Sequence, residues 1–175
     1  WLCISGINRG PNLSVDVLHS GTVSAAREAS LYGLPSLSVS LATYSHQDYS
    51  QSIEATLAMV ERLSELIKAA PSNILRPEGS RIRPIEGNGP NSLRSWFMQG
   101  NMFLNLNVPE NWNGTFQTVP LGARWYHNAT DMIDRESMGV AFEVGAARIV
   151  DEEIEMTDCH AIASGSASIT PMASW

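Results

Sequence analysis

Two apolar runs near the start of the chain flank a segment of small residues, and this order strongly limits the folds that the chain can adopt. The first run covers residues 1–5 (WLCIS) and the second covers residues 34–41 (LPSLSVSL). Between them, residues 20–31 are rich in alanine and other small residues, and Gly33 stands where a helix would end. The pattern predicts a strand, a loop, a helix and a second strand, which together form a βαβ unit of a parallel sheet.

The rest of the chain adds one long helix and several further strands. Apolar residues recur at spacings of three and four over residues 51–70, which predicts an amphipathic helix. We expect Asp48 and Gln51 to form its capping box and Pro71 to mark its end. Residues 102–108 alternate apolar and polar side chains as a strand does. Three further strands are expected, at residues 115–121, 140–144 and 169–172.

These elements predict an α/β fold in which a Rossmann-like parallel sheet and its helices form the core and carry an antiparallel β extension. A length of 175 residues fits a single domain, residues 1–175. Within it we expect residues 1–70 to form the βαβ part of the core, 71–156 an irregular β extension, and 157–175 a return to the core. Because the chain starts inside a strand and stops soon after another, we expect this domain to be truncated at both ends.

The charge and the cysteine content narrow the range of partners. Eleven Lys and Arg against eighteen Asp and Glu give a net charge of -7, which disfavours a nucleic-acid polymer or an anionic membrane. A small anionic ligand stays compatible with this charge, because backbone N–H groups can bind phosphate on an acidic protein. Cys3 and Cys159 follow no disulfide or metal pattern; we place them in a buried strand and a polar loop, and expect a reducing, cytoplasmic compartment.

Small hydrogen-bonding residues fill the loop that follows the first apolar run. Asn8 and Asn12 lie in a turn shaped by glycine and proline, and Ser20, Gly21 and Thr22 open the predicted helix. The side-chain oxygen of an asparagine suits Mg²⁺, Mn²⁺ or Ca²⁺, whereas the free N–H groups of a helix start bind phosphate. The residues therefore indicate a phosphate site beside a metal ligand, at the carboxyl edge of the sheet. Ordinary turns and helix caps use the same residue types, and they are the alternative.

The stretch SGINRGPNLSVDVLHSGTVSAAREASLYGLPSLSVSL, residues 5–41, closely resembles the SurE (survival protein E) family of metal-dependent nucleotidases and phosphatases. The family pattern is SGIN-x-GPN-x-x-x-DV-x-YSGTV-x-A-A-x-E. His19 stands where the family usually has Tyr, and Ser14 stands where it usually has Gly. The later stretches LNLNVP (104–109) and TDCHAIASGSASITPM (157–172) are similar to the family as well, so that the resemblance covers nearly the whole chain.

This resemblance implies a function and a set of site residues. It implies the hydrolysis of phosphate monoesters, mainly nucleoside 5′- and 3′-monophosphates, with one divalent cation such as Mg²⁺ or Mn²⁺. It implies that Asn8 is a metal ligand and that Asn12 lines the phosphate site together with Ser20, Gly21 and Thr22. Asn12 and Ser20 are the expected catalytic residues, and the expected assembly is a homodimer or a homotetramer.

The sequence also departs from the family. The family's principal metal ligands are two aspartates of an N-terminal Asp-Asp-Gly motif, with a serine further along, and none of these is in this sequence. We expect Asp16 and Asp48 to have solvated or capping roles, so that the chain needs the missing ligands for activity. Two alternatives stay open: a phosphate- or nucleotide-binding remnant without turnover, and a structural subunit that completes its sheet with another chain.

Other reactive side chains are weaker candidates. The acidic residues 151–155 are expected to form a solvated loop rather than a metal site. The four histidines are scattered, and we expect His19 to make a local hydrogen bond or packing contact. Three aromatic residues are candidates for stacking on a base, although buried packing positions are commoner: Trp96, Trp125 and Tyr126.

Overall fold

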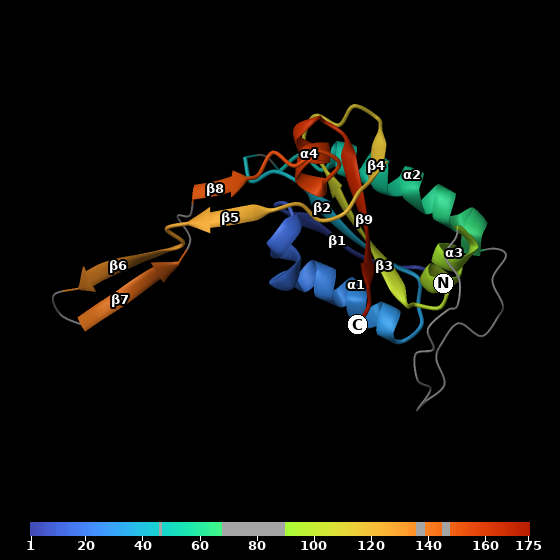
Figure 1. The fold of residues 1–175 in the computed structure, drawn as a ribbon, viewed down its shortest axis with the longest axis horizontal. Coiled ribbons are helices and arrows are strands. Elements are labelled where there is room, and N and C mark those ends of the chain that lie inside the picture. The colour runs from blue at the N-terminus through green and yellow to red at the C-terminus, as the bar shows by residue number, and fades with distance from the viewer. Residues whose placement is uncertain (46, 68–89, 136–138, 145–147) are drawn as a thin grey trace.

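A five-stranded sheet lies at the centre of the computed structural model, which describes residues 1–45, 47–67, 90–135, 139–144 and 148–175 (Figure 1). Its strand order is β1-β2-β3-β9-β4. The strands are β1 (Cys3–Arg9), β2 (Ser36–Leu41), β3 (Met102–Val108), β9 (Ala167–Ala173) and β4 (Phe116–Thr118). Strands β1, β2 and β3 run parallel, whereas β9 pairs antiparallel with β3 and parallel with β4. The sheet is therefore parallel in its first half and mixed in its second half.

The βαβ unit predicted from the sequence is present at the start of the chain. Helix α1 (Gly21–Leu31) joins β1 to the parallel strand β2. Ser20 is the N-cap of this helix, because its hydroxyl oxygen accepts a hydrogen bond of 3.1 Å from the backbone N–H of Val23. The helix ends two residues before Gly33, as expected. The predicted α/β fold class is confirmed.

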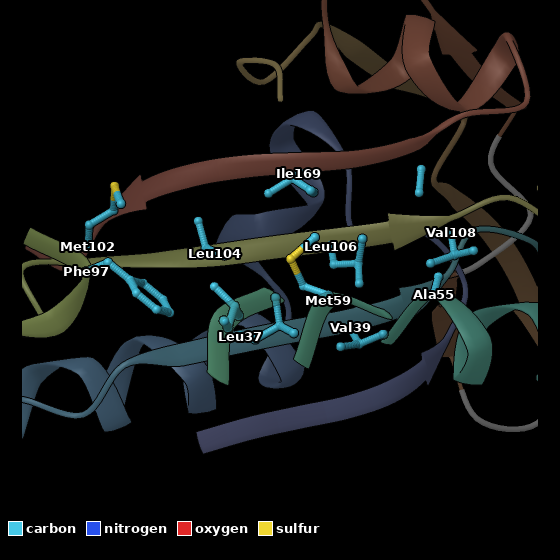
Figure 2. Packing of buried hydrophobic residues seen from close by; sticks show 12 residues of the cluster. Leu37, Val39, Ala55, Met59, Phe97, Met102, Leu104, Leu106, Val108 and Ile169 are labelled. Atoms are coloured by element: carbon cyan, nitrogen blue, oxygen red, sulfur yellow. The ribbon is translucent and has the colours of Figure 1, made fainter. Parts of the chain in front are cut away.

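One face of the sheet is apolar, and two helices cover it. Helices α2 (Ser50–Ile67) and α3 (Pro90–Met98) place Met59 and Phe97 among the side chains of β2 and β3 (Figure 2). The buried cluster consists of Leu37, Val39, Ala55, Met59, Leu63, Phe97, Met102, Leu104, Leu106, Val108, Ala167 and Ile169. Burial of one large apolar side chain contributes about 1.5–3 kcal/mol, so this layer makes a large contribution to the stability of the fold.

The opposite face of the same strands carries buried polar side chains. The register aligns Ser38 with Asn105 and Ser40 with Asn107, and all four side chains are fully buried. Phe103, on the same face, packs against α1, so this is the face that α1 covers. We call the following residues the polar face: Ser36, Ser38, Ser40, Asn105, Asn107, Ser168 and Thr170. Since buried polar groups are costly without hydrogen bonds, this face requires partners from the segment that lies over it.

Two antiparallel strand pairs form the predicted β extension. Strand β5 (Arg124–His127) pairs with β8 (Arg148–Asp151), and β6 (Thr130–Arg135) pairs with β7 (Gly139–Val144). Figure 1 shows that the two pairs follow one another away from the central sheet. Among the described residues, no helix is long and apolar enough to span a membrane.

The position of β3 differs from the prediction. We placed residues 71–156 in the extension, yet β3 lies in the sheet between β2 and β9, and β4 forms the edge. The alternation of residues 102–108 is typical of a strand with one face in solvent, but all seven residues are buried. Asn105 and Asn107 face the buried polar layer instead of water. Assigning β3 and β4 to the extension was therefore wrong, whereas the limits of the whole domain stay a prediction.

The start of α2 also differs in detail. Asp48 Oδ1 accepts hydrogen bonds from the backbone and the hydroxyl of Ser50, at 2.9 and 2.6 Å. These bonds, with the hydroxyl as the larger cause, lower the pKa of Asp48. Gln51 does not close a capping box, because its Oε1 accepts a hydrogen bond of 2.7 Å from the backbone N–H of Trp112. The predicted helix end at Pro71 lies outside the described residues.

The turn between α3 and β3 provides a test of how closely the layers pack. Gly100 has φ +66°, and a Cβ at this position would lie 2.1 Å from the carbonyl oxygen of Ser30. Gly114 also has a positive φ, +84°, but nothing lies within 4 Å of its Cβ position. We expect Gly100→Ala to lower the free energy of unfolding by about 2–5 kcal/mol, from strain and overpacking, and Gly114→Ala by about 1 kcal/mol, from strain alone. Urea denaturation measures both losses, and equal losses would contradict this account of the turn.

Candidate functional site

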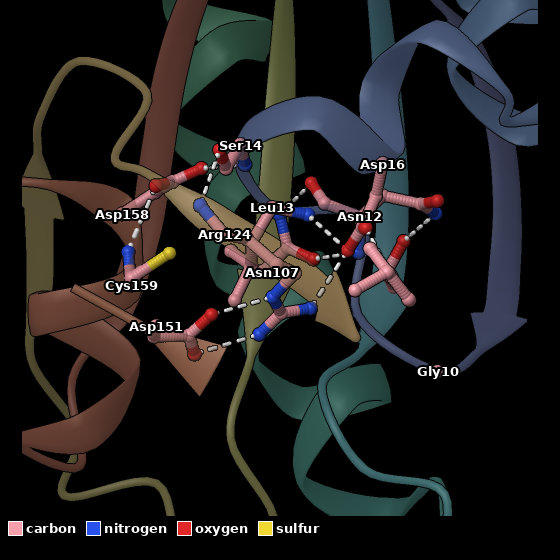
Figure 3. Close-up of polar contacts among 12 residues, drawn as sticks. Gly10, Asn12, Leu13, Ser14, Asp16, Asn107, Arg124, Asp151, Asp158 and Cys159 are labelled. Carbon is pink, nitrogen blue, oxygen red and sulfur yellow. Dashed lines mark hydrogen bonds and ion pairs between the residues drawn. The ribbon is translucent and has the colours of Figure 1, made fainter. Parts of the chain in front are cut away.

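The candidate site lies at the carboxyl edge of the parallel strands. Residues 10–20 leave the end of β1, cross the ends of β2 and β3, and lead into α1. The middle of this segment is a short 3₁₀ helix, η1 (Ser14–Leu18). Figure 3 shows the segment surrounded by polar side chains from the sheet, the extension and the last helix. Ligands of α/β proteins bind at this edge, so these residues are candidates for ligand binding and catalysis.

Asn8 lies within β1, so the prediction that it belongs to the loop after the strand was wrong. It is opposite Ser40 of β2, and the register of the two strands shifts between Ser5 and Asn8. Such irregularities change the direction of a side chain at a strand end. The Asn8 amide nitrogen donates a hydrogen bond of 3.0 Å to the carbonyl oxygen of Gly10. This bond fixes the orientation of the side chain, and Oδ1 is the atom that could serve as a cation ligand.

A divalent cation needs more ligands than Asn8. Mg²⁺ sites in proteins ordinarily use one or two carboxylates together with water or substrate oxygens. In the part of the chain that the structure describes, no group of three or more His, Cys, Asp or Glu could hold a metal ion. Asn8 therefore fits as one neutral oxygen ligand, but the described residues do not make a complete metal site.

Asn12 anchors the segment to the polar face. Its side chain donates a hydrogen bond of 2.6 Å to the hydroxyl of Ser40, and its backbone N–H donates one of 2.8 Å to Asn107 Oδ1. Its carbonyl oxygen accepts from the amides of Asn105 and Asn107, at 2.8 and 3.1 Å. Only 5% of Asn12 is exposed. Asn12, which the resemblance places at the phosphate site, thus directs its amide nitrogen to Ser40.

The start of α1 combines a cap with open N–H groups. The first N–H groups of a helix have no partner within the helix, and they carry the positive end of its dipole. Ser20 caps the helix through its oxygen and keeps its hydroxyl hydrogen for another acceptor. Gly21 is exposed and nothing lies within 4 Å of its Cβ position, and Thr22 is half-buried. The cap and the proposed phosphate site are thus compatible with each other.

Asp16 belongs to an ionic cluster, with a buried ion pair, that the sequence did not predict. Arg124 Nη1 lies 2.7 Å from Asp16 Oδ2, and Arg124 holds Asp151 through two bonds of 2.6 and 2.8 Å. The Tyr126 hydroxyl donates to the other oxygen of Asp16. We call Asp16, Arg124, Asp151 and Tyr126 the Asp16 cluster. Asp16 is only 8% exposed, so a solvated role is wrong, whereas its bond of 3.1 Å from the N–H of Leu13 confirms the capping role.

The pKa values of the Asp16 cluster follow from its burial and charges. Burial of the Arg124 guanidinium opposes its charge, but the hydrogen bonds and charges of Asp151 and Asp16 outweigh burial and raise its pKa. Burial, followed by the hydrogen bond and the charge of Asp16, raises the pKa of Tyr126. Arg124 therefore is charged and Tyr126 is a neutral donor near neutral pH.

Ser14 joins the same segment to the C-terminal part of the chain. Helix α4 (Asp158–Ala163) begins with a fully buried aspartate, Asp158. Asp158 accepts from the N–H of Ser14 at 2.9 Å and from the N–H of Gly122 at 2.6 Å. The Ser14 hydroxyl donates to the carbonyl of Gly122 at 2.8 Å and accepts from the N–H of Arg124 at 3.0 Å. Ser14 has φ +49°, a left-handed conformation that glycine adopts without strain. This conformation explains why glycine is usual at this position in the family that the sequence resembles.

Several weaker candidates are settled by their contacts. Cys159 lies in α4 and is buried, not in a polar loop, and burial followed by the charge of Asp158 raises its pKa to about 12. Asp151 ends β8 in the ion pair described above, and the other acidic residues of 151–155 are exposed. Trp96 packs against the apolar cluster as expected, but Trp125 is 56% exposed and Tyr126 41% exposed, so the packing role predicted for these two is wrong. His19 is exposed, and its N–H donates to the carbonyl of Asp16 at 3.0 Å.

Sequence comparisons identify relatives along nearly the whole chain. The family model "Survival protein SurE" matches residues 1–130. The 5'-nucleotidase SurE of Synechococcus sp. (strain JA-3-3Ab) is 34% identical over 175 residues, which cover 98% of this chain and 56% of that protein. The 5'-nucleotidase SurE of Pelotomaculum thermopropionicum is 35% identical over 172 residues, which cover 98% of this chain and 54% of that protein. The chain thus spans about half the length of these curated relatives.

A comparison of structures agrees with these matches at the level of the fold. The crystal structure of a SurE protein from Aquifex aeolicus aligns with a TM-score of 0.65 at 24% sequence identity. The alignment covers 99% of this chain and 59% of that chain. The two proteins share the same α/β architecture.

Two substitutions of Ser14 separate the contribution of its hydroxyl to stability from that of its backbone conformation. Both Ser14→Ala and Ser14→Gly remove the two hydroxyl hydrogen bonds, each worth about 1 kcal/mol. Only glycine relieves the left-handed strain of about 1–2 kcal/mol, and part of that gain is offset by its greater freedom in the unfolded chain. We expect Ser14→Ala to be about 1 kcal/mol less stable than Ser14→Gly in thermal or urea unfolding. The reverse order would show that the left-handed conformation carries no strain here.

Because the ion pair between Asp16 and Arg124 is buried, we expect the stability of the fold to depend strongly on both residues. Asp16→Asn leaves the buried guanidinium with Asp151 alone, and we expect a loss of about 2–4 kcal/mol in the free energy of unfolding. Asp48→Asn, the same change on an exposed aspartate, should have a much smaller effect. A double-mutant cycle with Arg124→Gln measures the coupling directly. Additive losses for Asp16→Asn and Arg124→Gln would contradict the proposed pairing.

Proposed function

The chain belongs to the survival protein SurE family, and from this membership we propose that the protein containing it is a divalent-metal-dependent phosphomonoesterase. Its proposed substrates are nucleoside 5′- or 3′-monophosphates or other small phosphate esters. The observation that carries the proposal is that Asn8, near the end of β1, and the start of α1 both lie at the carboxyl edge of the sheet, joined by a segment that Asn12 holds in place. We propose a cytoplasmic homodimer or homotetramer as the working form.

Asn8 and a divalent cation have the first proposed role. We propose Asn8 Oδ1 as one ligand of Mg²⁺ or Mn²⁺, with Ca²⁺ as a possible substitute in binding. Such a cation polarises the phosphoryl oxygens and promotes formation of the attacking hydroxide. The bond from the Asn8 amide to the carbonyl of Gly10 supports this role because it holds the ligand oxygen in one orientation.

The start of α1 has the second proposed role. We propose that the hydroxyl of Ser20 and the backbone N–H groups of Gly21 and Thr22 bind the phosphate and stabilise the negative charge that develops on it. Asn12 acts as a positioning residue, since it is almost fully buried and its amide donates to Ser40. Of the two residues that the resemblance implies to be catalytic, Ser20 is thus proposed to contact the substrate and Asn12 to hold the segment in place.

A second function is favoured by the incomplete metal site of the described residues. One neutral ligand does not hold Mg²⁺, and no further cluster of metal-binding side chains lies in the described part of the chain. A protein limited to these ligands would bind phosphate or a nucleotide at the start of α1 without hydrolysing it. Phosphate binding without turnover distinguishes this second function from the first.

Phosphate release from nucleoside monophosphates and p-nitrophenyl phosphate, with Mn²⁺ or Mg²⁺, tests the enzymatic proposal. We expect activity that EDTA abolishes and Mn²⁺ restores. Asn8→Ala should raise the Mn²⁺ concentration needed for half-maximal activity, and it should weaken Mn²⁺ binding in calorimetry. Ser20→Asp retains a capping oxygen but places a negative charge beside the phosphate, so we expect a folded protein whose kcat/KM falls about 100-fold or more.

Ser24→Ala provides the matched control for this experiment. Ser24 is exposed one turn further along α1 and takes no part in the proposed site, so its substitution should leave kcat/KM unchanged. A wild-type protein that binds phosphate without releasing it from any ester would instead support the second function. Full activity in both Asn8→Ala and Ser20→Asp would overturn the proposed site.

A further inference from the structure

Tyr44 is an exposed aromatic residue that lies directly against the candidate site. It follows β2, and its ring packs on Gly10, where a Cβ would lie only 2.3 Å from Tyr44 Cε1. The carbonyl oxygen of Gly10 is the acceptor that holds the side chain of Asn8. The ring of Tyr44 therefore packs on the same residue that orients the proposed metal ligand. More than half of Tyr44, 53%, is nevertheless exposed, so the core does not require its ring.

The backbone around Tyr44 is fixed by hydrogen bonds. Arg9 Nη2 donates to the carbonyl oxygen of Tyr44 at 2.8 Å. The N–H of Gly10 donates to the carbonyl of Leu41 at 2.9 Å, and the N–H of Ala42 donates to the carbonyl of Val108 at 2.8 Å. The loop that carries Tyr44 is thus tied to the ends of β1 and β3, the same edge of the sheet at which the site lies.

The side chain of Tyr44 also lies close to fixed groups. Its phenol is near Tyr126 and Asp16, and Tyr126 is itself bound to the buried carboxylate of Asp16. Burial, followed by the charge of Asp16, raises the pKa of Tyr44, so its phenol is neutral and is no base or nucleophile near neutral pH. What Tyr44 offers a ligand is the face of a ring that is already in position, and such preorganisation lowers the entropy cost of binding.

We propose that Tyr44 is the base-stacking residue of the site: the purine or pyrimidine of a nucleoside monophosphate packs on its exposed ring face while the phosphate lies at the start of α1. This inference rests on the proposed function and specifies its substrate class. Stacking on an aromatic ring is tolerant of base identity because every base has a π face. The site would therefore select nucleotides over phosphate esters without a base, with little preference among the bases.

Trp125 provides a matched control, because it is as exposed as Tyr44 but differently placed. It neighbours Tyr126 in β5, and successive side chains of a strand point to opposite faces. Tyr126 points toward Asp16, so Trp125 points to the other side of the strand, where its indole nitrogen donates to Glu152 at 2.6 Å. Removal of Trp125 thus takes away a comparable aromatic surface that does not border the site.

The test compares AMP and UMP with ribose 5-phosphate, which lacks a base, in the full protein with Mn²⁺. We expect Tyr44→Leu to lower kcat/KM for both nucleotides about ten-fold relative to ribose 5-phosphate, mainly through KM. Tyr44→Phe and Tyr44→Trp should retain the preference for nucleotides, since they keep a ring. Trp125→Ala should show the same ratio as the wild-type protein.

Other outcomes would overturn the inference without overturning the enzyme. An equal loss for nucleotides and ribose 5-phosphate in Tyr44→Leu would show that the ring only supports the loop, and no loss would show that it has no role. If the wild-type protein hydrolyses none of the three esters, the proposed catalytic function fails instead. Calorimetric binding of AMP and ribose 5-phosphate then decides the stacking role, because a loss confined to AMP supports it and an equal or absent loss overturns it.

Discussion

The hydrogen bonds between Asn12 and the polar face are the interaction on which the rest of the site depends. The central strands bury polar side chains on one face, and without partners these groups would oppose folding. Asn12 supplies partners to Ser40, Asn105 and Asn107 at once, through its side chain, its N–H and its carbonyl. Ser168 and Thr170, on the same face, have hydroxyls with no partner among the described residues. The segment after β1 is thus held to the sheet by the same bonds that make the polar face tolerable.

The β extension and α4 restrain the same segment from its other side. Asp16 and Ser14 are joined to Arg124 and Asp158, which lie more than 100 residues further along the chain. A buried ion pair of this kind contributes little net stability compared with an apolar replacement, but the loss of one partner is costly. The pair is therefore better understood as a restraint on geometry than as a source of stability. It fixes the path of the chain immediately before the start of α1, where the proposed phosphate site lies.

Local patterns in the sequence predicted the elements of the fold, but not the contacts between distant segments. The start of α1 at Ser20 and its end before Gly33 followed from residues within one or two turns, and β3 matched its predicted bounds of 102–108. The sheet position of β3 was missed because alternation does not distinguish a solvated face from a buried polar one. The two asparagines of β3, in an otherwise apolar strand, were the available signal. Arg124 gave no such signal, since its two carboxylate partners are distant in sequence.

The Asn12 hydrogen bonds and the contacts of Asp16 and Ser14 explain how the candidate site can be rigid although its residues come from different elements. Asn8 belongs to a strand, the proposed phosphate-binding groups belong to a helix start, and Tyr44 belongs to a loop after another strand. Each is attached to the same short segment: Asn8 and Tyr44 through Gly10, and α1 through the chain itself. A ligand that touches all three would therefore meet groups whose relative positions are set before it binds. Preorganisation of this kind favours charge stabilisation, because the donors need not reorient when the phosphate becomes more negative.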